Sequence, residues 1–338
     1  MSVDADYFRG CRVGIPGLAA VDDPRYLIFN WGHVEQYIDQ FDLMQSLEPG
    51  AKVIFNIYND AYNSIHVRDC VLRTGVNGRC FVLTGSMDFA KANHDLGFRF
   101  LPFAWHWWHS YHYQQMVAGN PPQTHNPNWQ SRSYNLSCLN RSPSFSRFAT
   151  YYELQSQPWF GQVYKSFGDV STVADHVTDN NIVDWFLSRR TEFPYSSQSD
   201  YDGGNDWSSS TAAYADTYAN LITETFSPTV LMSEKTVKPL VAGNIIFVAA
   251  ANDFLSLLKS LKFEVDFAGI DNSYDTIPDR HQRITGMVAE INTVYHDLPD
   301  IWQQNLPKLK YNREWLLSKD FKNLMLHDVK ELFEYTSD

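Results

Sequence analysis

The chain has 338 residues, and its 39 acidic and 27 basic side chains give a formal net charge of −12. Hydrophobic residues make up 44% of the sequence, which is enough to build packed cores and excludes wholesale disorder. The length predicts about two domains. We expect no membrane-spanning helix, because no run of 18 apolar residues occurs. We also expect no secretory signal, because the first ten residues lack basic and apolar regions.

The first part of the chain alternates between strand and helix patterns. Strands are predicted at 26–30, 51–60, 79–85 and 98–105. Helices are predicted at 31–46, 66–75 and 87–97, the last with Gly97 as its cap. This alternation is typical of βαβ units and a largely parallel sheet, in which ligands bind beyond the carboxyl ends of the strands.

A Pro-rich stretch at 119–133 is interpreted as a linker, after which the alternation resumes. Strands are predicted at 134–140, 162–168, 219–225, 244–250 and 264–267. Helices are predicted at 144–155 (with Ser142 or Ser144 as N-cap), at 233–241, at 253–263, and once or twice between 307 and 335. Residues 196–212 are predicted to form an exposed loop.

This pattern predicts an α/β fold with two Rossmann-like αβα domains that face a cleft. The expected division is an N-terminal domain over 1–125, a C-terminal domain over 126–305, and terminal helices over 306–338 that pack back on the N-terminal domain. A cleft between two such domains is a natural site for a small molecule. Neither GxGxxG nor GxxxxGK[ST] occurs, which weighs against dinucleotide-binding and P-loop proteins.

Four scattered cysteines (Cys11, Cys70, Cys80 and Cys138) form no CxxC motif. This usage predicts a reducing, cytoplasmic environment, with neither a disulfide framework nor a zinc site.

The negative charge is unevenly distributed. Residues 1–152 hold 12 acidic and 12 basic side chains, whereas residues 153–338 hold 27 and 15. No acidic residue occurs between Asp95 and Glu153. The net charge argues against a polyanionic partner, but this stretch could accommodate an anion. The alternative is a chance run in a loop-rich, aromatic segment. The basic residues of the stretch are Arg99, Arg132, Arg141 and Arg147, with His106, His109, His112 and His125.

The segment from Ser233 to Pro239 carries the clearest chemical signal. Ser233 before an acidic residue is a good helix start, and a helix N-terminus can receive a phosphate. Lys235 is unfavourable for the helix dipole unless an anion lies over it. Glu234 could then accept hydrogen bonds from ribose hydroxyls. The alternative is a solvated Glu234–Lys235 pair on a surface turn.

A second polar turn follows the strand at 134–140. Arg141 lies at the carboxyl end of that strand, where its planar guanidinium could bind a diphosphate. Arg147 lies one turn into the next helix and is either a second phosphate ligand or a surface residue.

These segments resemble the C-terminal domain of a group of phage and bacterial glycosyltransferases, and the Glu-Lys pair is similar to the donor motif of fucosyltransferase-like GT-B enzymes. The resemblance covers roughly residues 134–166 and 221–285, nearly half of the chain. It depends on the order of several motifs: the Leu-Asn-Arg turn ending at Arg141, Thr223-Glu224, Ser233 to Thr236, Lys238-Pro239, Ser273-Tyr274-Asp275 and Arg283.

The resemblance implies a GT-B architecture in which the C-terminal domain holds a nucleotide-diphosphate sugar, and a UDP- or GDP-sugar is expected. It implies that Glu234 contacts the ribose or sugar, that Lys235 and Arg141 neutralise the diphosphate, and that Glu224 lies in the same pocket. The donor-binding set expected from the residues and the resemblance is Arg141, Arg147, Glu224, Ser233, Glu234, Lys235 and Lys238. A metal-free site must stabilise the leaving diphosphate with cations and helix N-termini. We expect no metal, and we interpret the DxD sequence at Asp200–Asp202 as a chance match in a loop.

The general base is open among several residues. His33 follows the first strand and Asp60 closes the second, and these are the two catalytic candidates. His106 and His109 are further possibilities, and a retaining enzyme would need no such base.

An aromatic segment runs from Phe103 to Tyr113. We expect it either to form a buried wall or to stack an acceptor sugar or an extruded base. The candidate acceptor-binding residues are Trp105, His106, Trp108 and His109.

The functional hypothesis is therefore a glycosyltransferase whose acceptor is a hydroxymethylated base in phage-type DNA. One alternative acceptor is a surface glycan or a lipid-linked saccharide. A second alternative is an inactive GT-B-like module that only binds nucleotides or glycans, and a third is a non-glycosyl enzyme of doubly wound type.

Overall fold

The computed structural model describes residues 26–30, 52–57, 68, 80–84, 87–101, 129–140, 143–193, 195–196, 212–224, 232–325 and 327. Contacts divide the chain into two compact units, each containing one sheet. The first unit comprises Met1–Tyr113, Ser227–Leu231 and Lys322–Asp338, and the second comprises Gln114–Phe226 and Met232–Phe321. The expected domain boundary at residues 125 and 126 lies outside the described residues.

The first unit contains a parallel sheet of four strands in the order β1-β2-β3-β4. The strands are β1 (Tyr26–Asn30), β2 (Lys52–Ile57), β3 (Cys80–Thr84) and β4 (Phe98–Phe100), so all four predicted strands of this part are confirmed. The predicted helix at 87–97 is a helix α5 (Met87–Ala92) followed by a 3₁₀ turn η2 (His94–Leu96). Gly97 ends this turn with a left-handed backbone at φ 87°, as the sequence predicted.

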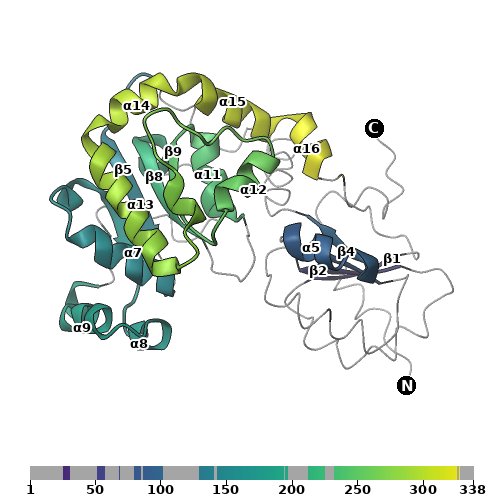
Figure 1. Ribbon diagram of the computed structural model, residues 1–338, viewed down its shortest axis with the longest axis horizontal. Helices are drawn as coiled ribbons and strands as arrows, with labels where there is room; N and C mark the ends of the chain where they lie inside the picture. The colour runs from purple at the N-terminus through teal and green to yellow at the C-terminus, as the bar shows by residue number, and fades with distance from the viewer. Residues whose placement is uncertain are drawn as a thin grey trace. The chain divides into compact units, whose positions relative to one another are not determined.

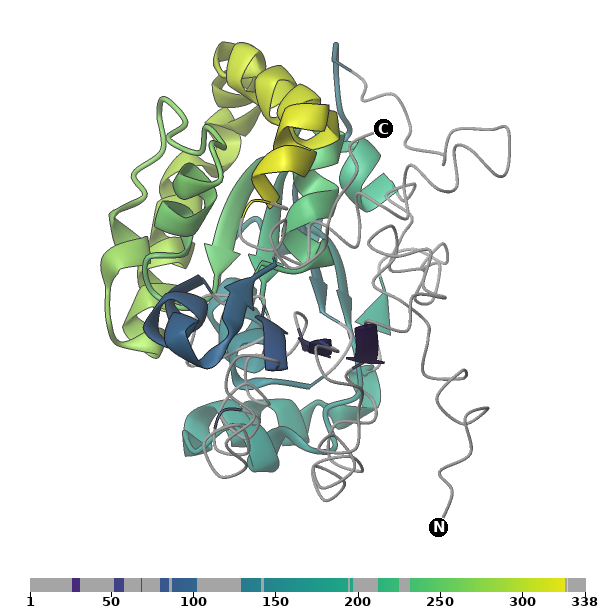
Figure 2. The same ribbon diagram turned by 90° about the vertical axis from the view of Figure 1, so that its right-hand side faces the viewer.

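The second unit contains a sheet of five strands in the order β7-β6-β5-β8-β9, in which only β7 is antiparallel. The strands are β5 (Tyr134–Asn140), β6 (Tyr164–Phe167), β7 (Tyr195–Ser196), β8 (Thr217–Thr223) and β9 (Ile245–Ala249). In Figure 2 the green arrowheads of this sheet point away from the yellow helix α15 (Leu306–Leu317).

Helices cover both faces of this second sheet. Figure 1 shows α7 (Phe145–Gln155) and α13 (Arg280–Val294) side by side, and both contact the sheet. The other face receives α11 (Glu234–Ala242), which packs against β8, β9 and α15. Further helices among the described residues of this unit are α8 (Val173–His176), α9 (Asn180–Ser188), α10 (Ala212–Ala215), α12 (Phe254–Ser260) and α14 (Leu298–Gln304). The mixed α/β fold with parallel sheets agrees with the expectation from the sequence.

The predicted helix starts at serine residues are confirmed. The side chain of Ser144 accepts a hydrogen bond from the backbone N–H of Arg147, so Ser144 rather than Ser142 is the N-cap of α7. Ser233 caps α11 in the same way through the N–H of Lys235. Helices α9 and α13 were not predicted, although each begins after an aspartate whose side chain caps its first turn, Asp179 and Asp279.

The predicted strand at 264–267 is wrong. Phe263, Val265 and Phe267 are buried while their neighbours Glu264 and Asp266 are exposed, which is the alternation of a strand. Two asparagine side chains from the C-terminal helices take the place of a neighbouring strand. The amide of Asn312 pairs with both backbone groups of Glu264 at 2.8 Å, and the amide of Asn305 pairs with those of Ala268 at 2.9 Å.

The predicted helices after residue 307 are confirmed as α15 and α16 (Lys319–Met325). Residues 119–128 of the predicted linker lie outside the described residues, and its last part packs against the second unit. Trp129 stacks on Trp302 with ring centroids 6.1 Å apart, and Arg132 is 7% exposed.

Candidate functional site

The strand order of the second unit reverses between β5 and β8. The chain runs from β5 outward to β6 and then returns to place β8 on the other side of β5. In open α/β sheets this reversal opens a crevice at the carboxyl ends of the two strands, and ligands bind there. Asn140 ends β5 and Thr223 ends β8, and the Thr223 hydroxyl donates a hydrogen bond of 2.5 Å to Asn140 Oδ1.

Glu224 lies directly after β8, and its carboxylate holds the first turn of α11. This carboxylate is 1% exposed and accepts hydrogen bonds from the Ser233 backbone N–H at 3.0 Å and from the Ser233 hydroxyl at 2.5 Å. It also accepts one from the Thr236 hydroxyl at 2.6 Å. Glu224, Ser233 and the helix start therefore form one buried unit, in which both carboxylate oxygens of Glu224 are occupied by protein donors.

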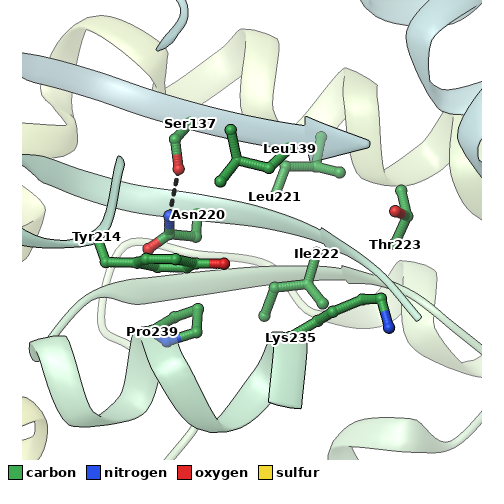
Figure 3. A pocket seen from close by; sticks show the side chains of 9 residues that line it. All are labelled: Ser137, Leu139, Tyr214, Asn220, Leu221, Ile222, Thr223, Lys235 and Pro239. Carbon is green, nitrogen blue, oxygen red and sulfur yellow. Dashed lines mark hydrogen bonds between the residues drawn. The ribbon is translucent and has the colours of Figure 1, made fainter. Parts of the chain in front are cut away.

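Lys235 is the cation of this turn. Its ammonium group lies 3.3 Å from the Ser233 hydroxyl oxygen, and its side chain is half-buried. Figure 3 shows the amine at the same end of the pocket as Thr223, toward the end of the sheet at which the strands finish. Lys238, one turn further on, is buried and lies 6.0 Å from the ring centre of Tyr214.

The N-terminus of α7 lies beyond the other strand of the reversal. Arg147 in its first turn is 7% exposed, so the surface alternative for this residue is wrong. Arg280 of α13 reaches the same turn, where its guanidinium donates to the Ser146 hydroxyl at 2.8 and 3.1 Å and lies 4.4 Å from the Phe145 ring centre. Burial lowers the pKa of Arg280 to about 10, and the nearby charge of Arg283 adds to this effect.

A small pocket opens between the sheet and α11. Its volume is about 30 Å³, and Figure 3 shows the nine side chains that line it. They are Ser137, Leu139, Tyr214, Asn220, Leu221, Ile222, Thr223, Lys235 and Pro239. A pocket of this size accepts groups of water size and is too small for a nucleotide. Of the expected donor-binding residues whose side chains the structure describes, Lys235 is the one that lines it.

A buried polar network, which was not predicted from the sequence, lies beneath this pocket. Arg132 donates to the backbone oxygens of Ala242 at 2.8 Å and Thr217 at 2.6 Å, and to the side chain of Asn244. It thereby satisfies carbonyl groups at the C-terminus of α11. The sequence signal that could have revealed the network is the presence of polar residues, such as Asn220, inside otherwise apolar strands.

Two arginines of the acid-free stretch are therefore structural. Arg99 donates to the backbone oxygens of His94 at 3.1 Å and Phe98 at 3.0 Å, and Arg132 donates to those at the end of α11. Arg132 is therefore not available to bind an anion, contrary to the expectation for this stretch. The contacts of Arg99 give that expectation no support.

The Ser273-Tyr274-Asp275 segment and Arg283 meet at the carboxyl end of β9. Arg283 donates to the backbone oxygen of Ala250 at 2.9 and 3.1 Å, and Asp275 Oδ2 accepts from the Leu255 N–H at 2.9 Å. Asp275 Oδ1 is buried and has no hydrogen-bond partner among the described residues. Burial raises the pKa of Asp275 to about 6.

Several predicted site residues lie outside the described residues. These are His33, Asp60, Trp105, His106, Trp108, His109 and Arg141. Glu234 is the first residue of α11, and its side chain is likewise outside the description. Cys138 is a buried free thiol, and burial raises its pKa to about 12.

Within the described ranges, no group of three or more His, Cys, Asp or Glu side chains could hold a metal ion. A search of the same residues finds no helix with the length and apolar character needed to cross a membrane. A comparison of the chain with known protein families gives no match, and a search among curated proteins finds none with significant sequence similarity.

Proposed function

We propose that this chain is a glycosyltransferase of the GT-B type, which moves a sugar from a nucleotide-diphosphate donor to an acceptor hydroxyl group. One observation carries the proposal: two serine-capped helices, α7 and α11, begin beside the carboxyl ends of β5 and β8, where the strand order reverses. The N-terminus of a helix favours anions, because its N–H groups and its dipole both face the ligand.

The side chains at these two helix starts suit a diphosphate. Lys235 and Arg147 supply positive charge from the first turns of α11 and α7, and the sequence places Arg141 in the turn between β5 and α7. Cations and helix N–H groups can stabilise the charge that develops on a leaving diphosphate without a metal. Glu224 serves this site indirectly, because its hydrogen bonds to Ser233 and Thr236 fix the first turn of α11.

The proposed acceptor site is in the N-terminal unit, where the sequence places the base candidates His33 and Asp60 and the aromatic segment around Trp105. The proposed acceptor is a hydroxymethylated base in DNA. A DNA acceptor should bind more weakly as salt increases, because binding releases counterions, whereas a neutral glycan should not. A salt titration of acceptor binding therefore separates the two acceptor classes. The proposed location is the cytoplasm, where sugar nucleotides are available.

The donor test is a thermal-shift and hydrolysis screen over UDP-, GDP-, ADP- and CDP-sugars. We expect at least one donor class to raise the melting temperature, and we expect Lys235→Ala to abolish that shift. Lys259→Ala is the matched control, because Lys259 lies on α12 and pairs with Asp266 at 2.7 Å. A panel in which no sugar nucleotide changes the melting temperature would contradict the proposal. Binding without any transfer to an acceptor would indicate a GT-B-like binding module instead.

A further inference from the structure

The buried polar network runs from Arg132 to the pocket. Arg132 determines which group is the donor and which is the acceptor in each of its hydrogen bonds. A guanidinium group has hydrogen-bond donors and no acceptor. The group that Arg132 meets on Asn244 is therefore the oxygen Oδ1. The nitrogen Nδ2 of Asn244 then faces the other way, where it donates to the backbone oxygen of Tyr214 at 2.9 Å and to Asn220 Oδ1.

The orientation of the Asn244 amide in turn determines that of the Asn220 amide, which contacts Ser137. Because Oδ1 of Asn220 accepts from Asn244, its Nδ2 must be the group that faces Ser137, and it donates to the Ser137 hydroxyl oxygen. Figure 3 draws this hydrogen bond. Ser137 is 1% exposed, and among the described residues no acceptor receives its hydroxyl hydrogen.

Ser137 must therefore act as a hydrogen-bond donor toward the pocket that it lines. A chain of hydrogen bonds that starts at a cation polarises each successive donor in the same direction. The pocket consequently offers a strengthened O–H donor, and a buried donor of this kind favours a ligand that carries a hydrogen-bond acceptor.

The described walls of the pocket favour a neutral acceptor group next to Ser137. Leu139, Ile222 and Pro239 contribute aliphatic surface, and Lys235, the charged member of the described lining, is assigned to the diphosphate. A buried carboxylate or phosphate would need several donors to replace its hydration. The volume of about 30 Å³ is room for roughly two groups of water size. A carbonyl oxygen and a methyl group are two such groups. The oxygen matches the Ser137 hydroxyl donor, and the methyl group matches the aliphatic side chains of the wall.

We propose that this pocket receives the acetamido group of a 2-acetamido sugar, and this inference rests on the proposed glycosyltransferase function. The carbonyl oxygen of the acetamido group accepts the hydrogen bond from Ser137, and its methyl group packs against Leu139, Ile222 and Pro239. Lys235 lines the same pocket and belongs to the proposed diphosphate site, so the sugar and the leaving group would be neighbours. The pocket would then determine which donor sugar the protein accepts.

The test uses sugar 1-phosphates on the full chain, so that the identity of the nucleotide does not matter. The probes are N-acetylglucosamine 1-phosphate, glucose 1-phosphate and glucuronic acid 1-phosphate, measured by calorimetry and by saturation-transfer NMR. We expect the acetamido sugar to bind about tenfold more tightly than glucose 1-phosphate, as one additional buried hydrogen bond would provide. We also expect its methyl protons to receive the strongest saturation.

Two variants of Ser137 and one control connect this preference to the pocket. Ser137→Ala removes the donor, and Ser137→Thr keeps the hydroxyl group but adds a methyl group to the site. Each should reduce the tenfold preference to about equal binding, while the affinity for glucose 1-phosphate stays within about twofold. Ser166→Ala should leave the preference unchanged, because Ser166 is a buried strand serine that does not line the pocket. Circular dichroism and melting temperature establish that each variant is folded.

Three results would overturn the inference. They are equal binding of the two neutral sugars by the unmodified protein, a preference that both Ser137 variants retain, and tightest binding of the glucuronic acid derivative. Failure of all three probes would also overturn it. The proposed function would then still depend on the separate panel of sugar nucleotides, because a donor without an acetamido group can raise the melting temperature in that panel.

Discussion

The hydroxyl group of Thr223 donates a hydrogen bond of 2.5 Å to Asn140 Oδ1, and this bond joins the carboxyl ends of β8 and β5. Both residues are almost completely buried, at 1% and 2% exposure. The amide nitrogen of Asn140 is directed at the Cys138 sulfur at 3.2 Å. At the strand reversal, the carboxyl ends of β5 and β8 are therefore joined by a buried hydrogen bond between side chains. The proposed ligand site lies beyond this bond, at the starts of α7 and α11.

Thr223→Val should destabilise the protein, because valine has nearly the shape of threonine but cannot donate to Asn140. The variant leaves a buried acceptor without its partner, which costs about 1–3 kcal/mol. Urea denaturation followed by tryptophan fluorescence measures the change in the free energy of unfolding. Thr223→Ser is the control, since it keeps the hydroxyl group and should lose less stability. An equal loss in both variants would show that packing, and not the hydrogen bond, matters at this position.

Glu224→Gln should destabilise the start of α11. Three protein donors point at the two carboxylate oxygens of Glu224, and an amide would turn one acceptor into a donor that faces Ser233 or Thr236. Loss of hydrogen bonds to a buried charged group costs about 1.5–3 kcal/mol. Denaturation of this variant and of Glu192→Gln, an exposed control, gives the comparison. Unchanged stability would mean that these hydrogen bonds do not stabilise the start of α11.

The helix starts could be predicted from the sequence because their causes are local. Ser144 and Ser233 each cap a turn within three residues, and the short-range pattern is sufficient to identify them. The sequence also identified Glu224 and Ser233, but as separate ligands of a donor. Their contact with each other crosses the segment between β8 and α11, and no periodic pattern reports a contact of that kind.

Longer-range pairing explains the predictions that failed. Buried and exposed residues alternate around Val265 as they do in a strand. The nearby backbone N–H groups, however, donate to the side chains of Asn305 and Asn312, about forty and fifty residues further along, and not to a neighbouring strand. Arg132 carries a charge that the sequence assigned to an anion, and its partners are backbone oxygens about 85 to 111 residues further along. The sequence shows which side chains can donate or accept hydrogen bonds, but the fold determines which groups become their partners.

Gly243→Ala should be strongly destabilising for two reasons. Gly243 ends α11 with φ at 68°, a left-handed conformation that is unfavourable for alanine. A Cβ atom at this position would also lie 2.4 Å from the Trp129 ring, which stacks on Trp302. The strain and the clash together should cost about 2–4 kcal/mol, measured by chemical denaturation. Gly161→Ala is the matched control, because beyond the local backbone no atom of the described residues lies within 4 Å of the point that its Cβ would occupy, and we expect little change or a small gain in stability. A Gly243→Ala variant as stable as this control would contradict the anchoring of Trp129 on the end of α11.

Asp275 should make the stability of the protein depend on pH in an unusual direction. Its carboxyl group is 3% exposed, and burial raises its pKa in the folded protein to about 6, above the value of about 4 for an unfolded chain. The folded state therefore binds a proton more readily than the unfolded state. This contribution to stability is fully present below about pH 4 and is lost as the pH rises through about 6. A pKa that is raised from about 4 to about 6 corresponds to at most about 3 kcal/mol of stability.

Asp275→Asn removes this titration while it keeps an oxygen for the Leu255 N–H. Arg283 retains the backbone oxygens of Ala250, Ile277 and Pro278 as acceptors in the variant, so it does not lose every partner. The unfolding free energy of the unmodified protein should therefore fall relative to that of the variant between pH 4 and pH 7, by about 1–3 kcal/mol. Urea denaturation at several pH values measures the difference, with Asp300→Asn as an exposed control that should show no such trend. If the difference between Asp275→Asn and the unmodified protein is the same at every pH, the carboxyl group does not titrate in this range and burial does not raise its pKa.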